Sequence, residues 1–158
     1  MKVKDLMTKT AVSCRSEMNL ASAGALLWEH DCGLLPIVDE TGKVTSVITD
    51  RDICIALSTR GGPSSEITTG EVSKPSVFVC SPEDEVRAAL KTMSREKIRR
   101  LPVVDDEGGL VGVLSINDIV LRAEKSEGKK PEISHDEVIR ALQSICAHGP
   151  STIHAAAA

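Results

Sequence analysis

The sequence predicts a mixed α/β protein of the α+β kind, built from two copies of one strand–helix–strand–strand–helix unit. Residues 35–42 (LPIVDETG) and 101–108 (LPVVDDEG) match at an offset of 66 residues, 101 minus 35, and this offset continues without a gap over a long stretch. The 158-residue chain, with 41% hydrophobic and 27% charged residues, is in the globular range. Because one unit of this size buries little surface alone, we expect the copies to pack together and form clefts at their junction.

Each copy is predicted to contain an opening turn or short helix, a short strand, a helix, two hairpin strands and a closing helix. In the first copy these are residues 3–7, 11–14, 20–29, 35–38, 44–48 and 50–57. In the second copy they are residues 69–73, 77–80, 86–95, 101–104, 110–114 and 116–124. The predicted domain organisation is a first repeat at 1–60, a linker at 61–68, a second repeat at 69–125, and a C-terminal helix and tail at 126–158.

The opening strands are predicted from β-rich composition, and the helices that follow them from caps and apolar spacing. Ser81 and Pro82, followed by acidic residues, are typical of a helix N-cap and first turn, and Ser16 and Glu17 fit the same role less fully. Apolar residues then recur at helical spacing in both copies, at Leu20, Ala23, Leu27, Val86, Ala89, Leu90 and Met93. These segments are therefore expected to be amphipathic helices.

Turn chemistry predicts the hairpins. In each copy an Asp-x-x-Gly sequence, beginning at Asp39 or Asp105, separates two β-rich runs. Beyond the repeats, residues 134–147 are predicted to form a helix with Ser134 at its cap. One face of that helix is expected to be apolar, with Val138, Ile139, Leu142 and Ile145.

Charge and composition argue against several classes of function. A net charge of −4 and a pI near 5.6 give no basic field for nucleic acid or anionic lipid. Trp28 and Phe78 are the only aromatic residues apart from histidine, and we expect Trp28 to be a buried or interface anchor. No apolar run reaches the roughly 20 residues of a membrane helix, and no signal-peptide pattern begins the chain. We therefore expect a cytoplasmic protein without membrane or nucleic-acid partners.

The cysteines and histidines indicate neither a disulfide framework nor a metal site. Five cysteines without a Cys-x-x-Cys pair fit reduced thiols, although a disulfide between two cysteines other than Cys14 and Cys80 stays open. Cys14 and Cys80 occupy equivalent positions and are expected to be small strand hydrophobes. The run 30–32 (HDC) and the other histidines lack zinc-ligand spacing. No pattern pairs a nucleophile with a base, so we expect no enzyme activity.

A hydroxyl and a carboxylate recur where a predicted strand ends and a helix begins, at Thr49 with Asp52 and at Ser115 with Asp118. The hydroxyl and free backbone N–H groups at such a position can converge on an anion. The carboxylate, one helical turn away, can accept two hydrogen bonds from a cis-diol, which is how acidic residues commonly hold a ribose. The alternative is that both groups only cap their own helix.

Together, the tandem order, the Leu-Pro-x-Val-Asp-x-x-Gly hairpin and the Thr/Ser-x-x-Asp-Ile helix start resemble the cystathionine β-synthase (CBS) domain pair, also called a Bateman module. The resemblance covers about residues 3–57 and 69–123. The run 49–53 (TDRDI) is similar to small stand-alone two-CBS proteins of the hypoxic response protein type. The resemblance implies two repeats related by a pseudo-twofold axis, with facing sheets and adenine nucleotides in the clefts between them.

The resemblance further implies that each Thr/Ser-x-x-Asp motif grips a phosphate and a ribose. Arg99 and Arg100, at the edge of a predicted strand, could clamp a phosphate bidentately, whereas the first copy has only Arg51 nearby. The alternative for these arginines is a solvated charged surface. The remaining candidate contacts are apolar groups around the base and at the strand edge, namely Val12, Val77, Phe78 and Pro102. The alternative for Val12, Val77 and Phe78 is that they are ordinary core residues.

From this resemblance we expect a non-catalytic sensor without a required cofactor. Its regulatory ligand would be an adenine nucleotide (AMP, ADP or ATP) or another adenosyl compound such as NAD or S-adenosylmethionine. The alternative is a structural or protein-interaction module with vestigial pockets. The resemblance also implies a homodimer, and the output would pass to an unidentified protein effector. The helix at 134–147 is expected to pack on the module or on a dimer mate.

Overall fold

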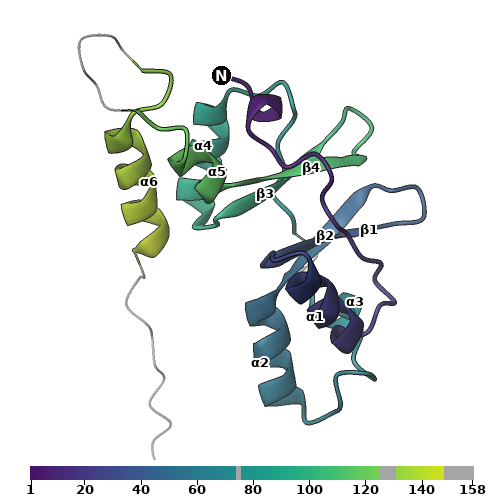
Figure 1. Cartoon of the computed structure of the whole chain (residues 1–158). Helices are drawn as coiled ribbons and strands as arrows, with labels where there is room; N and C mark the ends of the chain where they lie inside the picture. The colour runs from purple at the N-terminus through teal and green to yellow at the C-terminus, as the bar shows by residue number, and fades with distance from the viewer. Residues whose placement is uncertain (74–75, 125–130, 148–158) are drawn as a thin grey trace, which may run out of the picture.

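The computed structural model describes residues 1–73, 76–124 and 131–147 (Figure 1). The first repeat contains a 3₁₀ helix η1 (Val3–Asp5), helix α1 (Leu20–Glu29), strands β1 (Leu34–Val38) and β2 (Val44–Thr49), and helix α2 (Asp50–Arg60). The second contains α3 (Thr69–Val72), α4 (Val86–Glu96), β3 (Arg100–Val104), β4 (Leu110–Ser115) and α5 (Ile116–Val120), and α6 (His135–Cys146) follows it. The predicted mixed α/β fold is confirmed, although α5 is shorter than predicted.

Each repeat is built around an antiparallel hairpin, β1 with β2 and β3 with β4, in the same register. Two hydrogen bonds to one aspartate hold each turn. Asp39 Oδ1 accepts backbone N–H groups at 2.8 and 3.0 Å, and Asp105 Oδ1 does so at 3.0 and 2.7 Å. Gly42 and Gly108 have φ angles of 84° and 86°, which only glycine adopts without strain. The Asp-x-x-Gly prediction for these turns is confirmed.

The predicted strands at 11–14 and 77–80 are wrong as strands, because each is reduced to one parallel bridge. Cys14 N–H donates to the Pro36 carbonyl and Cys80 N–H to the Pro102 carbonyl, both at 3.0 Å. The return bonds come from Val38 N–H to the Cys14 carbonyl and from Val104 N–H to the Cys80 carbonyl, both at 2.9 Å. Pro36 and Pro102 have no N–H for the preceding rung, so neither parallel ladder can extend toward the start of its predicted strand. Cys14 and Cys80 are buried, as predicted for small hydrophobes.

The opening turn of each repeat packs against the other repeat. Val3 N–H donates to the Asp84 carbonyl at 2.9 Å, and Thr69 N–H donates to the Met18 carbonyl at 2.8 Å, two bonds related by the 66-residue offset. Val3 is fully buried in the core of the second repeat. Figure 1 shows the N-terminal segment running past β4 before the chain reaches α1. Each core therefore includes a segment from the other half of the chain.

The two hairpin turns also meet across the junction. Val44 N–H donates to the Gly108 carbonyl at 3.1 Å, and Leu110 N–H donates to the Gly42 carbonyl at 3.2 Å. Val44 corresponds to Leu110 and Gly42 to Gly108 at the 66-residue offset, so each bond is the repeat equivalent of the other. Reciprocal bonds of this kind are what a pseudo-twofold axis between the repeats produces, as the resemblance implied.

The predicted caps at Ser16 and Ser81 are wrong. Helix α1 begins after Asn19, whose side chain accepts Ser22 N–H at 2.8 Å. Helix α4 begins after Glu85, and residues 81–84 form a separate turn instead. The reason lies in the exchanged segments: the Ser16 carbonyl accepts Gly70 N–H, and the carbonyl at the equivalent position 82 accepts an N–H from the N-terminal segment.

Helix α6 packs on the second repeat, as one of the two predicted alternatives stated. Its cap is confirmed, because Ser134 Oγ accepts Glu137 N–H at 3.3 Å and the Glu137 carboxylate accepts Ser134 N–H at 2.9 Å. Val138, Ala141 and Ile145 are buried against the core that contains α4 and β3. The predicted apolar face is shifted, since Ile139 is 52% exposed and the smaller Ala141 is buried instead.

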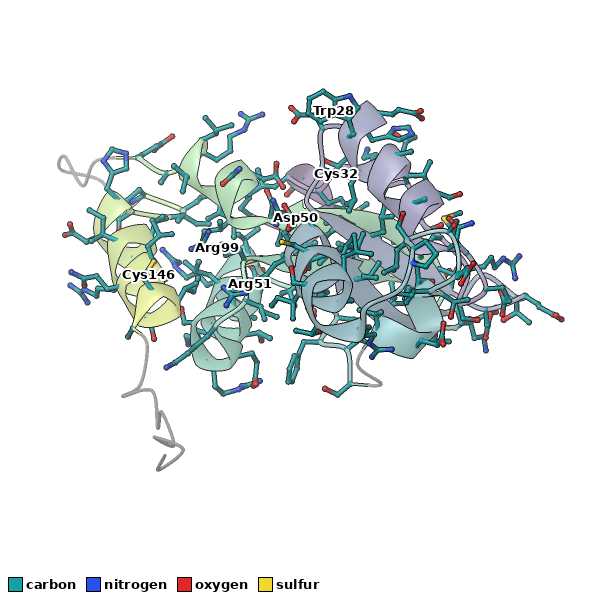
Figure 2. All side chains as sticks on the ribbon, turned by 90° about the horizontal axis from the view of Figure 1, so that it is seen from below. Trp28, Cys32, Asp50, Arg51, Arg99 and Cys146 are labelled. Carbon is teal, nitrogen blue, oxygen red and sulfur yellow. The ribbon has the colours of Figure 1, made fainter. Side chains whose placement is uncertain are left out.

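Trp28, at the end of α1, projects outward at one edge of the molecule (Figure 2), with 87% of its surface exposed. The alternative in which Trp28 is buried within its own chain is therefore wrong. Across the described residues, no helix combines the length and apolarity that crossing a bilayer requires.

Candidate functional site

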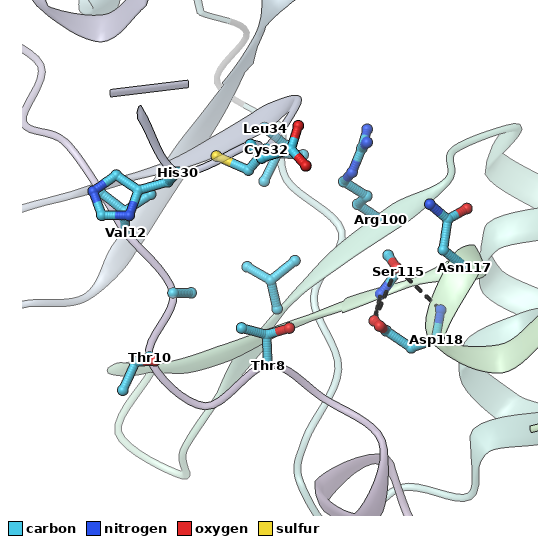
Figure 3. A pocket seen from close by; sticks show the side chains of 13 residues that line it. Thr8, Thr10, Val12, His30, Cys32, Leu34, Arg100, Ser115, Asn117 and Asp118 are labelled. Atoms are coloured by element: carbon cyan, nitrogen blue, oxygen red, sulfur yellow. Dashed lines mark hydrogen bonds between the residues drawn. The ribbon is translucent and has the colours of Figure 1, made fainter. Parts of the chain in front are cut away.

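A pocket of about 260 Å³ lies between the two repeats (Figure 3). In Figure 3, His30, Cys32 and Leu34 of the first repeat lie on one side of the pocket and Arg100, Ser115, Asn117 and Asp118 of the second on the other, whereas Thr8 of the N-terminal segment lies against the second-repeat hairpin. The lining residues are Thr8, Thr10, Ala11, Val12, His30, Asp31, Cys32 and Leu34 from the first half of the chain, and Arg100, Val113, Ser115, Asn117 and Asp118 from the second. The pocket therefore exists only because the repeats pack together.

Ser115 and Asp118 form a reciprocal cap at the start of α5. Ser115 donates from its hydroxyl and its N–H to Asp118 Oδ2, at 2.8 and 2.7 Å, and Ser115 Oγ accepts Asp118 N–H at 3.2 Å. The predicted helix-cap role is thus real. All of the described hydrogen bonds to the Asp118 carboxylate go to Oδ2, so Oδ1 can accept bonds from a ligand.

Thr49 and Asp52 repeat this geometry at the start of α2. Thr49 donates to Asp52 Oδ2 from its hydroxyl at 2.6 Å and from its N–H at 3.0 Å. Neither residue lines the pocket described above. By the offset, the counterpart of Thr8 on this side is residue 74, which lies outside the described residues.

Arg100 reaches from the start of β3 to the first repeat. A Cβ on Gly33 would lie 3.1 Å from Arg100 Nη2 and 3.3 Å from Asp50 Oδ2. Glycine at position 33 therefore leaves room for the guanidinium beside the first turn of α2. Arg100 is half-buried, and it is the one arginine or lysine that lines the described pocket. Its counterpart in the first repeat, Leu34, also lines this pocket but carries no charge.

Of the predicted site residues, the structure brings four together in the pocket: Val12, Arg100, Ser115 and Asp118. Thr49 and Asp52 lie apart from it, and so do Val77 and Phe78, which are the offset counterparts of Ala11 and Val12. The other three predicted contacts, Arg51, Arg99 and Pro102, do not line the pocket either.

These three residues have other surroundings. Arg51 is exposed in the first turn of α2. Arg99 is exposed, and its carbonyl accepts Ile116 N–H at 2.8 Å. Pro102 is buried beneath the Cys80 bridge. As in the predicted alternative, the side chains of Arg51 and Arg99 are part of the solvated surface.

Sequence reasoning missed much of the pocket wall, notably Thr8, Thr10, His30, Asp31 and Cys32. Thr8 reaches the pocket because the N-terminal segment pairs with Val113 of the other repeat, at 2.9 and 3.1 Å in the two directions. Nothing in the sequence alone signals this exchange. Residues 30–32 resemble only a metal motif in the sequence, and nothing in that pattern predicts a place in a pocket wall.

All five cysteines are free thiols in the structure. Burial raises the pKa of Cys14 to about 11 and that of Cys80 to about 12, so both stay protonated near neutral pH. A protonated, buried thiol is a poor nucleophile. Among the described residues, no three histidine, cysteine or acidic side chains are grouped closely enough to hold a metal ion.

Comparison with known proteins agrees with the fold and the repeat. The model of the CBS domain matches residues 3–59 and 70–125. An uncharacterized protein of Methanopyrus kandleri is 33% identical over 113 residues, which are 72% of this chain and 53% of that protein. The chain thus spans about half the length of this relative.

Three solved structures share the fold. The CBS domain pair of protein MJ0100, in complex with 5′-methylthioadenosine and S-adenosylmethionine, is 31% identical with a TM-score of 0.71, covering 77% of this chain and 94% of that one. A CBS domain protein of Pyrobaculum aerophilum complexed with AMP is 26% identical with a TM-score of 0.68, covering 75% and 89%.

The third structure is Hypoxic Response Protein I with two coordinated zinc ions, at 26% identity and a TM-score of 0.72, covering 78% of this chain and all of that one. It confirms the similarity to the hypoxic response type. The family model covers both repeats and most of the chain, and the chain belongs to the CBS domain family, as a tandem pair.

Proposed function

We propose that this chain is a non-catalytic regulatory module that binds an adenosyl ligand in the pocket between its repeats. The observation that carries the proposal is the convergence of Arg100 and Asp118 on one pocket with an apolar opposite wall at Val12 and Leu34. A cation, a carboxylate and an apolar wall are complementary to a phosphate, a ribose diol and a base. The adenosyl ligands of the MJ0100 and Pyrobaculum aerophilum structures support this assignment.

The size and charge of the pocket favour AMP among the adenosyl compounds. A volume of about 260 Å³ lies just below the roughly 300–1,000 Å³ that ligand pockets span, so a mononucleotide fits better than NAD. Asp118 Oδ1 can accept a ribose hydroxyl while Oδ2 keeps its capping bonds. Arg100 can pair with the phosphate of AMP, which is anionic, whereas S-adenosylmethionine carries a net positive charge and offers only its carboxylate to the guanidinium.

The test is calorimetric unfolding with AMP, ADP, ATP, NAD and S-adenosylmethionine, in wild type, Asp118→Ala and Asp52→Ala. The two variants lose the same kind of cap, so each should lose about 1 kcal/mol of stability without ligand. AMP at about 100 times its Kd should stabilise wild type by roughly 2.7 kcal/mol. We expect Asp118→Ala to abolish this gain and Asp52→Ala to keep it.

A second candidate function is an interaction module whose pockets bind no ligand, and the two reciprocal caps favour it. Both carboxylates have a complete structural role without ligand. If none of the five compounds raises the unfolding temperature of initially ligand-free wild type, this second function is preferred. A partial loss of the AMP effect in each variant would instead indicate a second ligand at the Thr49 side, because each bound ligand adds its own stabilisation.

We also infer a cytoplasmic homodimer that passes its signal to a separate protein. The free thiols suit a reducing compartment. The surface around α1 and α2 exposes Trp28, Ile55 and Leu57, whereas α6 covers the equivalent α4. A second copy seated on this surface would remove the exposed apolar area from water. A ligand could then act on the partner by its differential affinity for two dimer geometries.

A further inference from the structure

A second cavity, a groove of about 450 Å³, lies between α4 and α6 and shares no lining residue with the ligand pocket. Four basic side chains line it: Arg87, Lys91 and Arg95 on α4, and Arg140 on α6. Leu90 and Ala141, both buried, provide apolar lining. Figure 1 shows α6 beside α4, so the groove is a seam between a helix of the second repeat and the C-terminal helix that packs on it.

The basic row belongs to the second repeat alone. Arg87, Lys91 and Arg95 are spaced by four residues and so lie along one face of α4. At the offset of 66 residues, helix α1 carries Ala21, Ala25 and Glu29 at these positions. The shared fold therefore does not require the cations, which stand on a chain whose net charge is −4.

Within residues 1–73, 76–124 and 131–147, ion pairs neutralise only part of this positive charge. Arg87 pairs with Glu137 at 2.7 Å, and Arg95 pairs with its neighbour Glu96. Lys91 and Arg140 take part in none of the ion pairs of the described residues, and both are exposed. Two free cations therefore stand over an apolar seam, one on each helix.

We propose that the α4–α6 groove is a docking site for an acidic amphipathic segment of a partner protein. Apolar side chains of the segment would enter the seam at Leu90 and Ala141, and its carboxylates would pair with Lys91 and Arg140. Such a surface gives the partner both burial and charge complementarity, which together set orientation and association rate. The proposal is independent of the ligand pocket.

Other occupants fit the groove less well. Residues 148–158 of this chain contain no aspartate or glutamate, so charge complementarity does not select them. Nucleic acid and anionic membranes present dense rows of negative charge and favour many unpaired cations, whereas two of the four cations here, Arg87 and Arg95, are already paired with glutamates. The absence of aromatic residues from the groove also removes the base-stacking platform that single strands prefer.

The probe is a fluorescein-labelled peptide as long as α6, 12 residues, with leucines at helical spacing and glutamates elsewhere. A peptide of the same composition in scrambled order tests whether the groove reads amphipathic shape or only charge. Binding is measured by fluorescence anisotropy to the full chain, the double variant K91E/R140E and the control K9E/R122E. The control changes the same net charge at exposed residues outside the groove.

We expect wild type and K9E/R122E to bind the amphipathic peptide similarly and K91E/R140E to bind it about tenfold more weakly, with the loss mainly in the association rate. Unfolding temperatures of the two variants should match, which excludes misfolding as the cause. Equal binding of the scrambled peptide, or equal losses in both variants, would overturn the proposal. So would displacement of the peptide by a DNA oligonucleotide or by phosphatidylglycerol vesicles at equal charge concentration.

Discussion

Helix α4 of the second repeat is covered by α6, whereas α1, its counterpart in the first repeat, leaves Trp28 with 87% of its surface exposed (Figure 2). The start of β3 presents Arg100 to the ligand pocket, whereas the start of β1 presents Leu34. The two repeats differ in these side chains although they form equivalent backbone hydrogen bonds. Because these bonds join backbone groups, side chains could diverge without disturbing them. Under the proposals above, the second repeat supplies the cation of the pocket and one wall of the α4–α6 groove, and the first repeat supplies the surface for a second copy.

The largest effect is expected where the repeats are most alike, in their cores. Leu35 and Leu101 are equivalent and fully buried, so Leu35→Ala and Leu101→Ala should each lower the free energy of unfolding by about 3 kcal/mol. Since each opening turn packs in the other core, both variants should unfold in one transition shifted as a whole. Urea titration followed by circular dichroism measures this, and two separate transitions would show that the repeats are energetically independent.

The next effect concerns the difference between Arg100 and Leu34. Arg100→Leu gives the second repeat the side chain of the first, and we expect the Kd for AMP to rise about 10- to 100-fold, because a charged hydrogen bond contributes roughly 1.5–3 kcal/mol. Adenosine, which lacks the phosphate, should bind both proteins equally. Isothermal titration calorimetry measures these affinities. Arg99→Leu is the matched control, since Arg99 is exposed outside the pocket, and an equal loss there would indicate only a general field effect.

The sequence was sufficient to predict the repeat, both hairpins and the helices, because these depend on local patterns such as Asp-x-x-Gly at residue 39 and the apolar spacing from Leu20. It could not predict which copy each opening turn packs on. An offset comparison treats Val3 and Thr69 as equivalent, but it does not say that they exchange partners. Both misplaced caps, at Ser16 and Ser81, follow from that exchange.

The pocket shows the same division between local and tertiary information. Ser115 and Asp118 were predictable because their role depends on a motif of four residues. Thr8 and His30 were not, since they reach the pocket through tertiary packing. Trp28 looked like an anchor because of its residue type, and its exposure follows from its position next to Leu27, which takes the core-facing place.

A smaller effect concerns pH: the contact of α6 with α4, which α1 lacks, should make the free energy of unfolding depend on pH. Arg87 and the bonds from Ser134 hold the pKa of Glu137 at about 2, below its usual 4.5. A carboxyl with a lowered folded pKa contributes stability above about pH 4.5 and loses it as the pH falls toward 2. Because the Glu137 side chain is 37% exposed, solvent screening reduces the contribution to roughly 1 kcal/mol.

Glu137→Gln should therefore lower the unfolding temperature at pH 7 but change it little near pH 2, which calorimetry across that range can measure. Other carboxyl groups with lowered pKa, such as Asp39 and Glu71, make the wild type acid-sensitive as well, so the difference between the two proteins is the informative quantity. Asp136→Asn, an exposed change in the same helical turn, is the control. If the unfolding temperatures of wild type and Glu137→Gln differ by the same amount at every pH, the lowered pKa of Glu137 is not the source of the stabilisation.

The smallest effect on folding is expected for Trp28→Ala. This variant is also the sharpest test of the exposed surface of α1 and α2. An exposed side chain contributes little to the stability of one chain, so the free energy of unfolding of the monomer should change by less than about 0.5 kcal/mol. If a second copy sits on α1 and α2, however, Trp28 lies in the interface, where a single aromatic side chain commonly contributes about 2 kcal/mol or more. Light scattering after gel filtration should then show a dimer for wild type and a monomer for Trp28→Ala at low concentration.

The control is Leu121→Ala, which removes a similarly exposed side chain, 82% accessible, from the second repeat and should leave the dimer intact. Dissociation by Leu121→Ala but not by Trp28→Ala would place the partner on the second repeat, and the division of roles between the repeats would have to be reversed.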